Sequence, residues 1–365
     1  MNNKYYDIKP LLELNAEYNI IFGERSNGKT YSVLKLILER WLKDHNDKGV
    51  YMRRYDDEID PAKLKTLFSP FDEILEKMSK KKFNRIIYRS KAFHIGKYDW
   101  ENEEWVTKPE TFCYCSSINT YENNKGADRG HIKVILFDEV ITRRPYLTNE
   151  FICFQNALST YMRDRGDCQV FLVGNSVSFY CPYFREFNIE NVKDMNPGDL
   201  NCYTFENGVK IAVNYTESVG TQKASAKFFN FSEKAKMITT GKWEIPNYPH
   251  FPKSINFRKD VKMRFYIIFN EEQLCCCITH SPEGYFLYVH QQTKDIDPEE
   301  FIYSTEFDNN VRHCRSFRQG TLPIHKTILQ FINSGKIFFA DNTAGEIFTQ
   351  YYQWQMKASG DFSIS

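Results

Sequence analysis

The sequence predicts an α/β domain followed by a smaller α+β domain. Three observations support this fold class. A glycine-rich loop at 23–30 joins an apolar run to a helical pattern, two more apolar runs at 131–139 and 169–175 end in polar residues, and three closely spaced strand patterns occupy 263–290. Continuous apolar runs are typical of parallel strands buried on both faces, and the carboxyl ends of such strands usually face a site. A chain of 365 residues is long enough for two domains.

The first domain is expected at 1–207 and alternates between strands and helices. Its first strand leads through the glycine-rich loop into a helix at 31–42, where apolar residues recur at helical spacing. A short surface helix is expected after Asp60-Pro61, near 60–68. The strands of this domain are expected at 19–22, 49–54, 84–98, 111–117, 131–139 and 169–175.

The composition changes near residue 195, where Met195-Asn-Pro-Gly-Asp is a turn signal. The following segment is polar, rich in lysine and interrupted by prolines, so we expect a linker at 208–256 with some helical content around 225–237. The second domain is then expected at 257–365. Its predicted elements are strands at 263–270, 274–279 and 285–290, a helix at 322–334 and a strand at 336–341.

Charge and composition exclude several classes of protein. The 48 Lys+Arg residues nearly balance the 47 Asp+Glu residues, so a uniformly basic nucleic-acid-binding surface is excluded and any such contact must be local. The longest apolar runs, such as 134–137, are far shorter than the roughly 18 to 20 residues of a membrane span, and the N-terminus lacks a secretory signal. We therefore expect a cytoplasmic protein. The 10 cysteines lack paired C-x-x-C spacing and are interpreted as small buried hydrophobic residues rather than as a metal or disulfide site.

The loop at 23–30 matches the pattern G-x-x-x-x-G-K-[ST] at every fixed position and lies between a predicted strand and a predicted helix. Glycines in such a loop let successive N–H groups face an anion, and the helix N-terminus adds its positive end. Lys29 is expected to reach the terminal phosphates of ATP, and Thr30 to bind Mg²⁺. The predicted nucleotide-binding residues are Gly23, Glu24, Arg25, Ser26, Asn27, Gly28, Lys29, Thr30 and Asn175.

The site also requires an acidic element, because Mg²⁺ needs a carboxylate at the tip of a neighbouring strand. The apolar run 133–137 leads directly into Asp138 and Glu139. Asp138 is expected to hold the water shell of the metal, and Glu139 to polarise an attacking water. A glutamate at this position favours hydrolysis by water over transfer of the phosphoryl group to a second substrate.

A third apolar strand ends at Gly174-Asn175, where the Asn175 amide is expected either to sense the γ-phosphate or to cap the strand. Arginines beside such strands are candidates for a finger that neutralises charge in the transition state. The candidates are Arg143, Arg144, Arg163 and Arg165, each of which has a surface salt bridge as its alternative role.

The order of these features resembles the encapsidation ATPase of the small short-tailed phages, which drives genomic double-stranded DNA into a preformed prohead. The resemblance is specific over roughly residues 15–190 and only architectural beyond about 256. It implies an additional-strand P-loop ATPase domain of the large-terminase type, joined to a C-terminal domain similar to RNase H folds. The residues that carry it are 23–30, 51–55, 137–139, Arg163-x-Arg165, 174–178 and 182–184.

Several roles follow from this resemblance alone. It identifies Glu139 as the catalytic glutamate and Arg163 as a finger acting on a neighbouring subunit, and Arg25 falls where the family carries an arginine. Lys125 and Arg129 lie in a loop that would face DNA or the neighbouring active site, with a solvated loop as the alternative. Arg143 and Arg144 have no close counterpart in the family.

The resemblance also implies partners and a place of action. It predicts a ring of subunits, a pentamer, that binds double-stranded DNA and the prohead portal in the host cytoplasm, with a structural RNA as a further candidate partner. The C-terminal domain lacks the clustered carboxylates of a nuclease, because among its strand ends only Asp341 is acidic. We therefore expect a non-cutting docking domain. The basic residues of the expected docking surface are Lys253, Arg258, Lys259, Arg264, Arg312, Arg315 and Arg318.

Two other functions remain as alternatives. A nucleoside or nucleotide kinase would share the phosphate loop, but it would need an acceptor pocket and a lid. A portal-binding structural protein with a vestigial nucleotide site would not need the intact set of Lys29, Thr30, Asp138 and Glu139.

Overall fold

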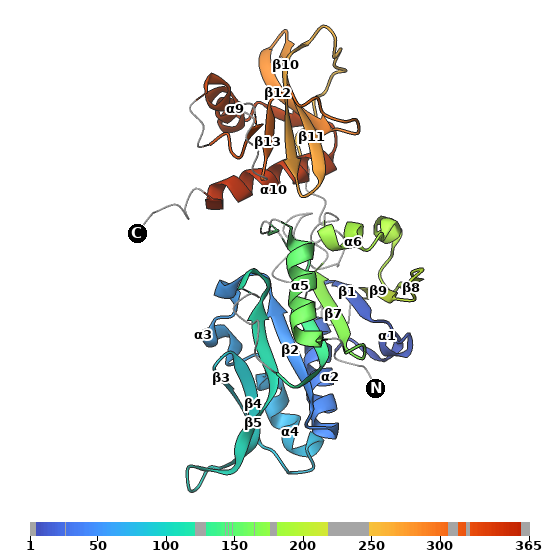
Figure 1. Cartoon of the computed structure of the whole chain (residues 1–365), viewed down its shortest axis with the longest axis vertical. Coiled ribbons are helices and arrows are strands. Elements are labelled where there is room, and N and C mark those ends of the chain that lie inside the picture. The colour runs from blue at the N-terminus through green and yellow to red at the C-terminus, as the bar shows by residue number, and fades with distance from the viewer. Residues whose placement is uncertain are drawn as a thin grey trace, which may run out of the picture. The chain divides into compact units, whose positions relative to one another are not determined.

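The computed structural model divides into two compact units, which are Met1–Thr142 with Asn149–Glu244, and Arg143–Thr148 with Ile245–Ser365 (Figure 1). Within the part of the chain that is described, none of the helices combines the length and the apolar character needed to cross a membrane. The described residues are 5–25, 27–120, 129–142, 144, 146–147, 149–163, 165–175, 181–217, 248–305, 313–318 and 322–358.

The first unit is built on a nine-stranded sheet in the order β3-β4-β5-β2-β6-β7-β1-β9-β8. Neighbouring strands are parallel from β5 across to β9, whereas β3, β4 and β8 add antiparallel pairs at the two edges. The strands are β1 (Tyr18–Gly23), β2 (Asp47–Arg53), β3 (Arg85–Arg89), β4 (Ala92–Asp99), β5 (Glu104–Ser117), β6 (His131–Asp138), β7 (Gln169–Asn175), β8 (Leu200–Thr204) and β9 (Lys210–Thr216).

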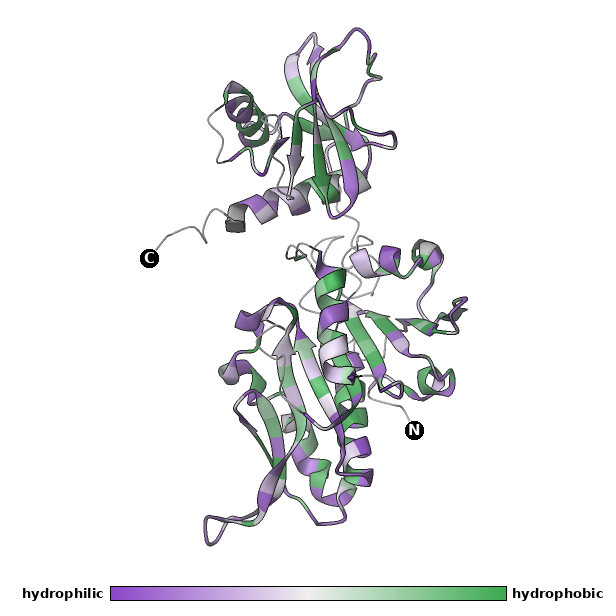
Figure 2. Ribbon diagram, in the orientation of Figure 1, coloured by the Kyte–Doolittle hydropathy of each residue, from purple (hydrophilic) through white to green (hydrophobic). Residues whose placement is uncertain are grey.

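Helices cover both faces of this sheet. Alternate strand residues such as Ile21 and Leu136 join a core with the helix that follows the glycine-rich loop. Their neighbours Phe22 and Phe137 face the other side, where their rings lie 5.8 Å from Phe184 and 5.7 Å from Phe154. Figure 2 shows the hydrophobic character of the central strands β1 and β7 between these layers. The helices are α1 (Lys9–Glu13), α2 (Lys29–Lys43), α3 (Pro61–Leu64), α4 (Asp72–Met78), α5 (Glu150–Met162) and α6 (Pro182–Glu186), with 3₁₀ turns η1 (Asp56–Glu58), η2 (Ser69–Phe71) and η4 (Glu190–Asp194).

The strands predicted for this unit are present, except that 84–98 is a hairpin of β3 and β4 rather than a single strand. Other expectations also need correction. The acidic strand β6 is not adjacent to β1, because β7 lies between them. The helix α5, which ends directly before Arg163, was not predicted. The predicted linker began at 208, yet β9 pairs with β1 inside the sheet, because its apolar residues Ile211, Ala212 and Val213 are buried there and extend the parallel array. The helical content predicted at 225–237 lies outside the described residues.

The second unit contains a six-stranded sheet in the order β14-β13-β10-β11-β12-β15. The three predicted strands correspond to β10, β11 and β12, which pair as an antiparallel meander, while β13 and β15 run parallel to β10 and β12. Helix α10 was missed by the sequence analysis, and its Tyr351 packs 5.8 Å from Phe269 of the sheet. The elements are β10 (Val261–Phe269), β11 (Glu272–Ser281), β12 (Gly284–Gln291), β13 (Ile302–Ser304), β14 (His313–Cys314), α9 (Pro323–Asn333), β15 (Ile337–Phe339) and α10 (Asn342–Ala358).

Close packing of α2 on β2 generates a stability prediction. A Cβ atom at Gly49 would lie 2.4 Å from Cγ2 of the buried Ile37. The Gly49→Ala variant should therefore lose about 1 to 3 kcal/mol of unfolding free energy, because a rigid β-branched side chain must move. Urea denaturation followed by circular dichroism measures this loss. Gly166→Ala is the control, since a Cβ there meets nothing within 4 Å. Equal unfolding midpoints for the two variants would contradict the prediction.

Candidate nucleotide-binding site

The glycine-rich loop leaves β1 at Gly23 and enters α2 at Lys29. Both of its fixed glycines have positive φ angles, 148° at Gly23 and 89° at Gly28, which residues other than glycine rarely adopt. A Cβ at Gly23 would also lie 2.2 Å from Oγ1 of Thr216. The loop geometry therefore depends on glycine at both positions, as the sequence pattern predicts.

Lys29 is buried at the first position of α2. Its Nζ donates to the carbonyl oxygens of Gly23 and Glu24, and to Oδ1 of Asn27 at 3.2 Å. Burial lowers the pKa of Lys29 to about 8, while Asp138 acts in the opposite direction. A buried ammonium group without a full counter-charge is stabilised by an anion in contact with it, so the loop is suited to bind a phosphate.

Thr30 and Asp138 meet at the carboxyl edge of the sheet, where Thr30 Oγ1 donates to Oδ1 of Asp138 at 3.0 Å. Two oxygens that occupy adjacent positions around an octahedral Mg²⁺ at about 2.1 Å lie about 3.0 Å apart. The pair therefore fits two neighbouring positions of a Mg²⁺ ion or its water shell. Burial raises the pKa of Asp138, and the nearby Arg53 guanidinium opposes this effect.

Arg53, at the end of β2, links the acidic residues of the site and was not assigned a role by the sequence analysis. Its Nη2 donates to Oε2 of Glu139 at 2.6 Å, and its Nη1 to Oδ2 of Asp138 at 3.4 Å. Tyr51, two residues earlier on the same face of the strand, donates its hydroxyl to the same Asp138 oxygen at 3.2 Å. Glu139 itself is half-exposed and has a φ of 63°. In this structure its carboxylate is held by an arginine rather than left to act on water.

The next residue, Arg54, is only 2% exposed and points to the other face of the sheet. Its Nε donates to Oε2 of the buried Glu150 at 2.7 Å, and its two terminal nitrogens donate to the carbonyl oxygens of Glu139 and Val140 at 3.0 and 2.9 Å. Tyr183 donates to the other Glu150 oxygen at 3.0 Å. Arg54 thus fixes the backbone on which Glu139 is carried, a role that the sequence alone did not indicate.

These elements surround a cavity of about 410 Å³, large enough for the phosphates and sugar of a nucleotide. The predicted residues Arg25, Asn27 and Asn175 all line it, and Tyr31 is an unpredicted addition. Ser26 lies outside the described residues. The residues that line the cavity are Arg25, Asn27, Gly28, Lys29, Thr30, Tyr31, Asp138, Glu139, Val173, Gly174 and Asn175.

Arg163 is exposed and lies at the far end of α5 from the cavity. The helix begins at Glu150, beside Arg54, and its 13 residues span about 20 Å. Just beyond it, Arg165 donates to the carbonyl of Gly130, which precedes the first residue of β6. Arg163 therefore lies at the amino edge of the sheet and does not line the cavity of its own chain.

Of the other basic candidates that the structure describes, Arg129 and Arg144 do not line this cavity. Arg129 has its guanidinium 5.0 Å from the ring of Tyr114 and 5.2 Å from the ring of Tyr161, also at the amino edge of β6. Arg144 is half-buried and belongs to the second unit. Lys125 and Arg143 lie outside the described residues.

Comparison with known proteins identifies the family. Residues 1–356 match the family described as "Podovirus DNA encapsidation protein (Gp16)". The chain belongs to this family. Among its relatives, the DNA packaging protein of Bacillus phage B103 is 25% identical over 344 residues, which cover 88% of this chain and 97% of the relative. The DNA packaging protein of Bacillus phage phi29 is 25% identical over 195 residues, about half of each chain.

Two solved structures of similar fold match nearly the whole length of this Gp16 family member. The structure described as "The Phi-28 gp11 DNA packaging Motor" has a TM-score of 0.56 and 19% identity, covering 100% of this chain and 99% of the other. "The bacteriophage Phi-29 viral genome packaging motor assembly" has a TM-score of 0.56 and 18% identity, covering 96% and 100%. At these identities the likeness concerns the fold.

The buried ion pair of Arg54 and Glu150 generates a second stability prediction. Glu150→Ala should cost roughly 3 to 5 kcal/mol, because it leaves the Arg54 guanidinium buried without its counter-charge. Lys91→Ala is the control, since the Lys91–Asp56 pair is exposed and should contribute within about 1 kcal/mol. Urea denaturation of both variants measures the difference. Similar losses of unfolding free energy in the two variants would contradict the prediction, because the buried pair would then contribute no more than the exposed one.

Proposed function

We propose that this chain is the ATPase of a DNA-packaging motor, which couples hydrolysis of ATP to movement of double-stranded DNA into a phage prohead. The observation that carries the proposal is the Thr30–Asp138 contact at the edge of a phosphate-binding loop. Membership in the DNA encapsidation family supplies the biological process. The position of β7 between β1 and β6 supports the additional-strand type of P-loop fold.

Five residues of the cavity have a proposed task. N–H groups of the loop and the ammonium group of Lys29 hold the phosphates of ATP, while Thr30 and Asp138 hold Mg²⁺. The bound Mg²⁺ neutralises charge on the phosphates. Glu139 orients and polarises the attacking water. Asn175 lines the same cavity and senses the terminal phosphate.

Hydrolysis by this site requires Glu139 to exchange partners. Its carboxylate is paired with Arg53 at 2.6 Å, so it becomes available to water only when this ion pair opens. Arg54 meanwhile keeps the Glu139 backbone in place through its contact with the carbonyl oxygen. The side chain of Glu139 can thus move while its backbone stays fixed.

The place of Arg163 supports a role between subunits. An arginine at the amino edge of the sheet is about 20 Å or more from the cavity at the carboxyl edge, so it does not reach the phosphates bound by its own chain. In a ring, which we propose to be a pentamer, Arg163 acts on the site of the next subunit. Lys125 and Arg129 are proposed to lie near DNA or the same interface.

The second unit is proposed as an RNase H-like docking domain that does not cut DNA. Its central order β12-β11-β10-β13-β14, with β13 parallel to β10, supports that fold. The carboxylate of Asp341 accepts a hydrogen bond from the backbone N–H of Ala344 at 2.8 Å, so it serves to begin α10. We propose that this unit binds the portal, with a structural RNA as a further partner, in the host cytoplasm.

The alternatives are less well supported. A nucleoside or nucleotide kinase is disfavoured by membership in a DNA encapsidation family. A structural protein with a vestigial site is disfavoured because Lys29, Thr30 and Asp138 keep the contacts that phosphate and Mg²⁺ binding require.

Two variants test the nucleotide site. Lys29→Ala should abolish ATP binding, because it removes the main cationic contact with the phosphates. Glu139→Gln should bind ATP normally but hydrolyse it at least about 100-fold more slowly, because only the water-polarising carboxylate is lost. Calorimetry measures binding, and phosphate release with and without double-stranded DNA measures turnover. Loss of binding in Glu139→Gln would refute its assigned role, and the absence of DNA-stimulated turnover in the wild type would refute the motor.

Mixed rings test Arg163. Arg163→Ala subunits keep Glu139, and Glu139→Gln subunits keep Arg163, so a mixture contains interfaces with both groups intact. Such interfaces should hydrolyse ATP although neither parent does, since an arginine finger contributes roughly 10³ to 10⁵ in rate. Arg165→Ala, which removes the contact with the Gly130 carbonyl, is the matched comparison, and it should stay active if Arg163 alone is the finger. An inactive mixture, under conditions where wild-type subunits form active rings, would exclude action across the interface.

A further inference from the structure

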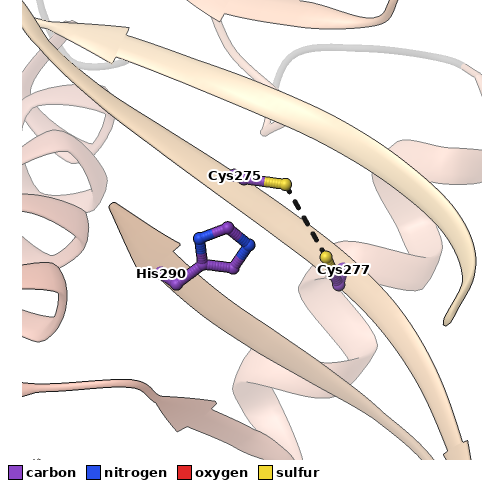
Figure 3. Close-up of side chains that lie close together, drawn as sticks. All are labelled: Cys275, Cys277 and His290. Carbon is purple, nitrogen blue, oxygen red and sulfur yellow. Dashed lines mark hydrogen bonds between the residues drawn. The ribbon is translucent and has the colours of Figure 1, made fainter. Parts of the chain in front are cut away.

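Two cysteines and a histidine lie together on one face of the sheet of the second unit. Cys275 and Cys277 are two residues apart on β11, so their side chains share a face, and His290 of β12 lies directly opposite Cys275. The ligand atoms of these three residues all lie within 4.8 Å of one another. Figure 3 shows the imidazole beside the two sulfurs, with one ring nitrogen directed toward them.

The spacing of the sulfurs fits a shared metal better than a disulfide. The Sγ atoms of Cys275 and Cys277 are 3.7 Å apart. Two sulfurs bound at about 2.3 Å to a tetrahedral Zn²⁺ lie about 3.8 Å apart. A disulfide requires Cβ atoms about 3.8 Å apart, whereas residues i and i+2 of a strand have Cα atoms about 6.6 Å apart and parallel side chains.

The histidine is held in the form that binds a metal. Nδ1 of His290 lies 2.8 Å from the carbonyl oxygen of Gln291, to which it can only donate. Nε2 of the neutral ring then carries the lone pair. A metal-binding histidine commonly donates its other nitrogen to a carbonyl in this way, which fixes both the tautomer and the ring orientation.

A positive charge lies beside one of the two sulfurs. Both cysteines are buried in a cluster with Tyr266 and Ile302. Arg264 of β10 lies opposite Cys277 in the register and brings a positive charge to its sulfur. Zn²⁺ with two thiolates is electrically neutral, so this arginine does not repel the occupied site.

We propose that Cys275, Cys277 and His290 bind a zinc ion, with a water molecule as the fourth ligand. The three residues come from two adjacent strands, so the ion ties β11 to β12 and stabilises the second unit. Thiolate and imidazole ligands select Zn²⁺ over the Mg²⁺ that oxygen ligands hold at the nucleotide site.

Titration of the reduced, metal-free full-length protein with Co²⁺ and with Zn²⁺ tests this site. Co²⁺ should give thiolate charge-transfer absorption at one ion per chain, and Zn²⁺ should displace it. His290→Gln should weaken binding at least tenfold, and Cys275→Ser with Cys277→Ser should abolish the absorption. Cys276→Ala is the matched control: Cys276 is equally buried on the same strand but faces Tyr351 of α10, and this variant should bind like the wild type.

Thermal unfolding gives a second readout that does not depend on the absorption. Saturating Zn²⁺ should raise the melting temperature of the wild type and of Cys276→Ala by about 5 °C, and that of His290→Gln by much less. Circular dichroism without metal checks that each variant is folded. The proposal is refuted if the wild type shows no stoichiometric thiolate absorption, or if His290→Gln binds as tightly as the wild type.

Discussion

The candidate site depends on the hydrogen-bonded register of three parallel strands. Gly23 of β1 lies opposite Asn175 of β7, and Val173 of β7 lies opposite Asp138 of β6. Because these strands point the same way, the loop, the amide and the carboxylate open on one edge and line one cavity. A shift of β6 by one residue would turn Asp138 to the opposite face, away from Thr30. The buried apolar residues of the strands fix the register, and so the core determines the chemistry of the edge.

The sequence was informative where a feature is local. The glycine-rich loop, the helix after it and the Asp138-Glu139 pair each lie within one short segment, so their spacing alone carries the prediction. The helix α5 also had a local signal that was overlooked: its buried Phe154, Leu158 and Tyr161 recur at helical spacing. The strand β9 was obscured by the polar, proline-containing region that follows it, although Ile211-Ala212-Val213 is a short apolar run typical of a buried strand.

The rest could not be predicted because it depends on residues that are distant in the sequence. The Arg53–Glu139 pair joins positions 86 apart, and the Thr30–Asp138 pair joins positions 108 apart. No spacing rule links such positions before the strand order is known. The cysteines show the same limit. Without C-x-x-C spacing they were interpreted as hydrophobic residues, and only the pairing of β11 with β12 brings a histidine to two of them.

The two consecutive arginines at the end of β2 divide the control of Glu139 between them. Successive residues of a strand point to opposite faces, so Arg53 reaches the carboxylates of Asp138 and Glu139, while Arg54 reaches the backbone carbonyl of Glu139 from the other side. An interaction with a half-exposed carboxylate is readily exchanged, whereas a buried guanidinium paired with Glu150 is not. The arrangement therefore combines a fixed backbone with a releasable side chain, as the role proposed for Glu139 requires.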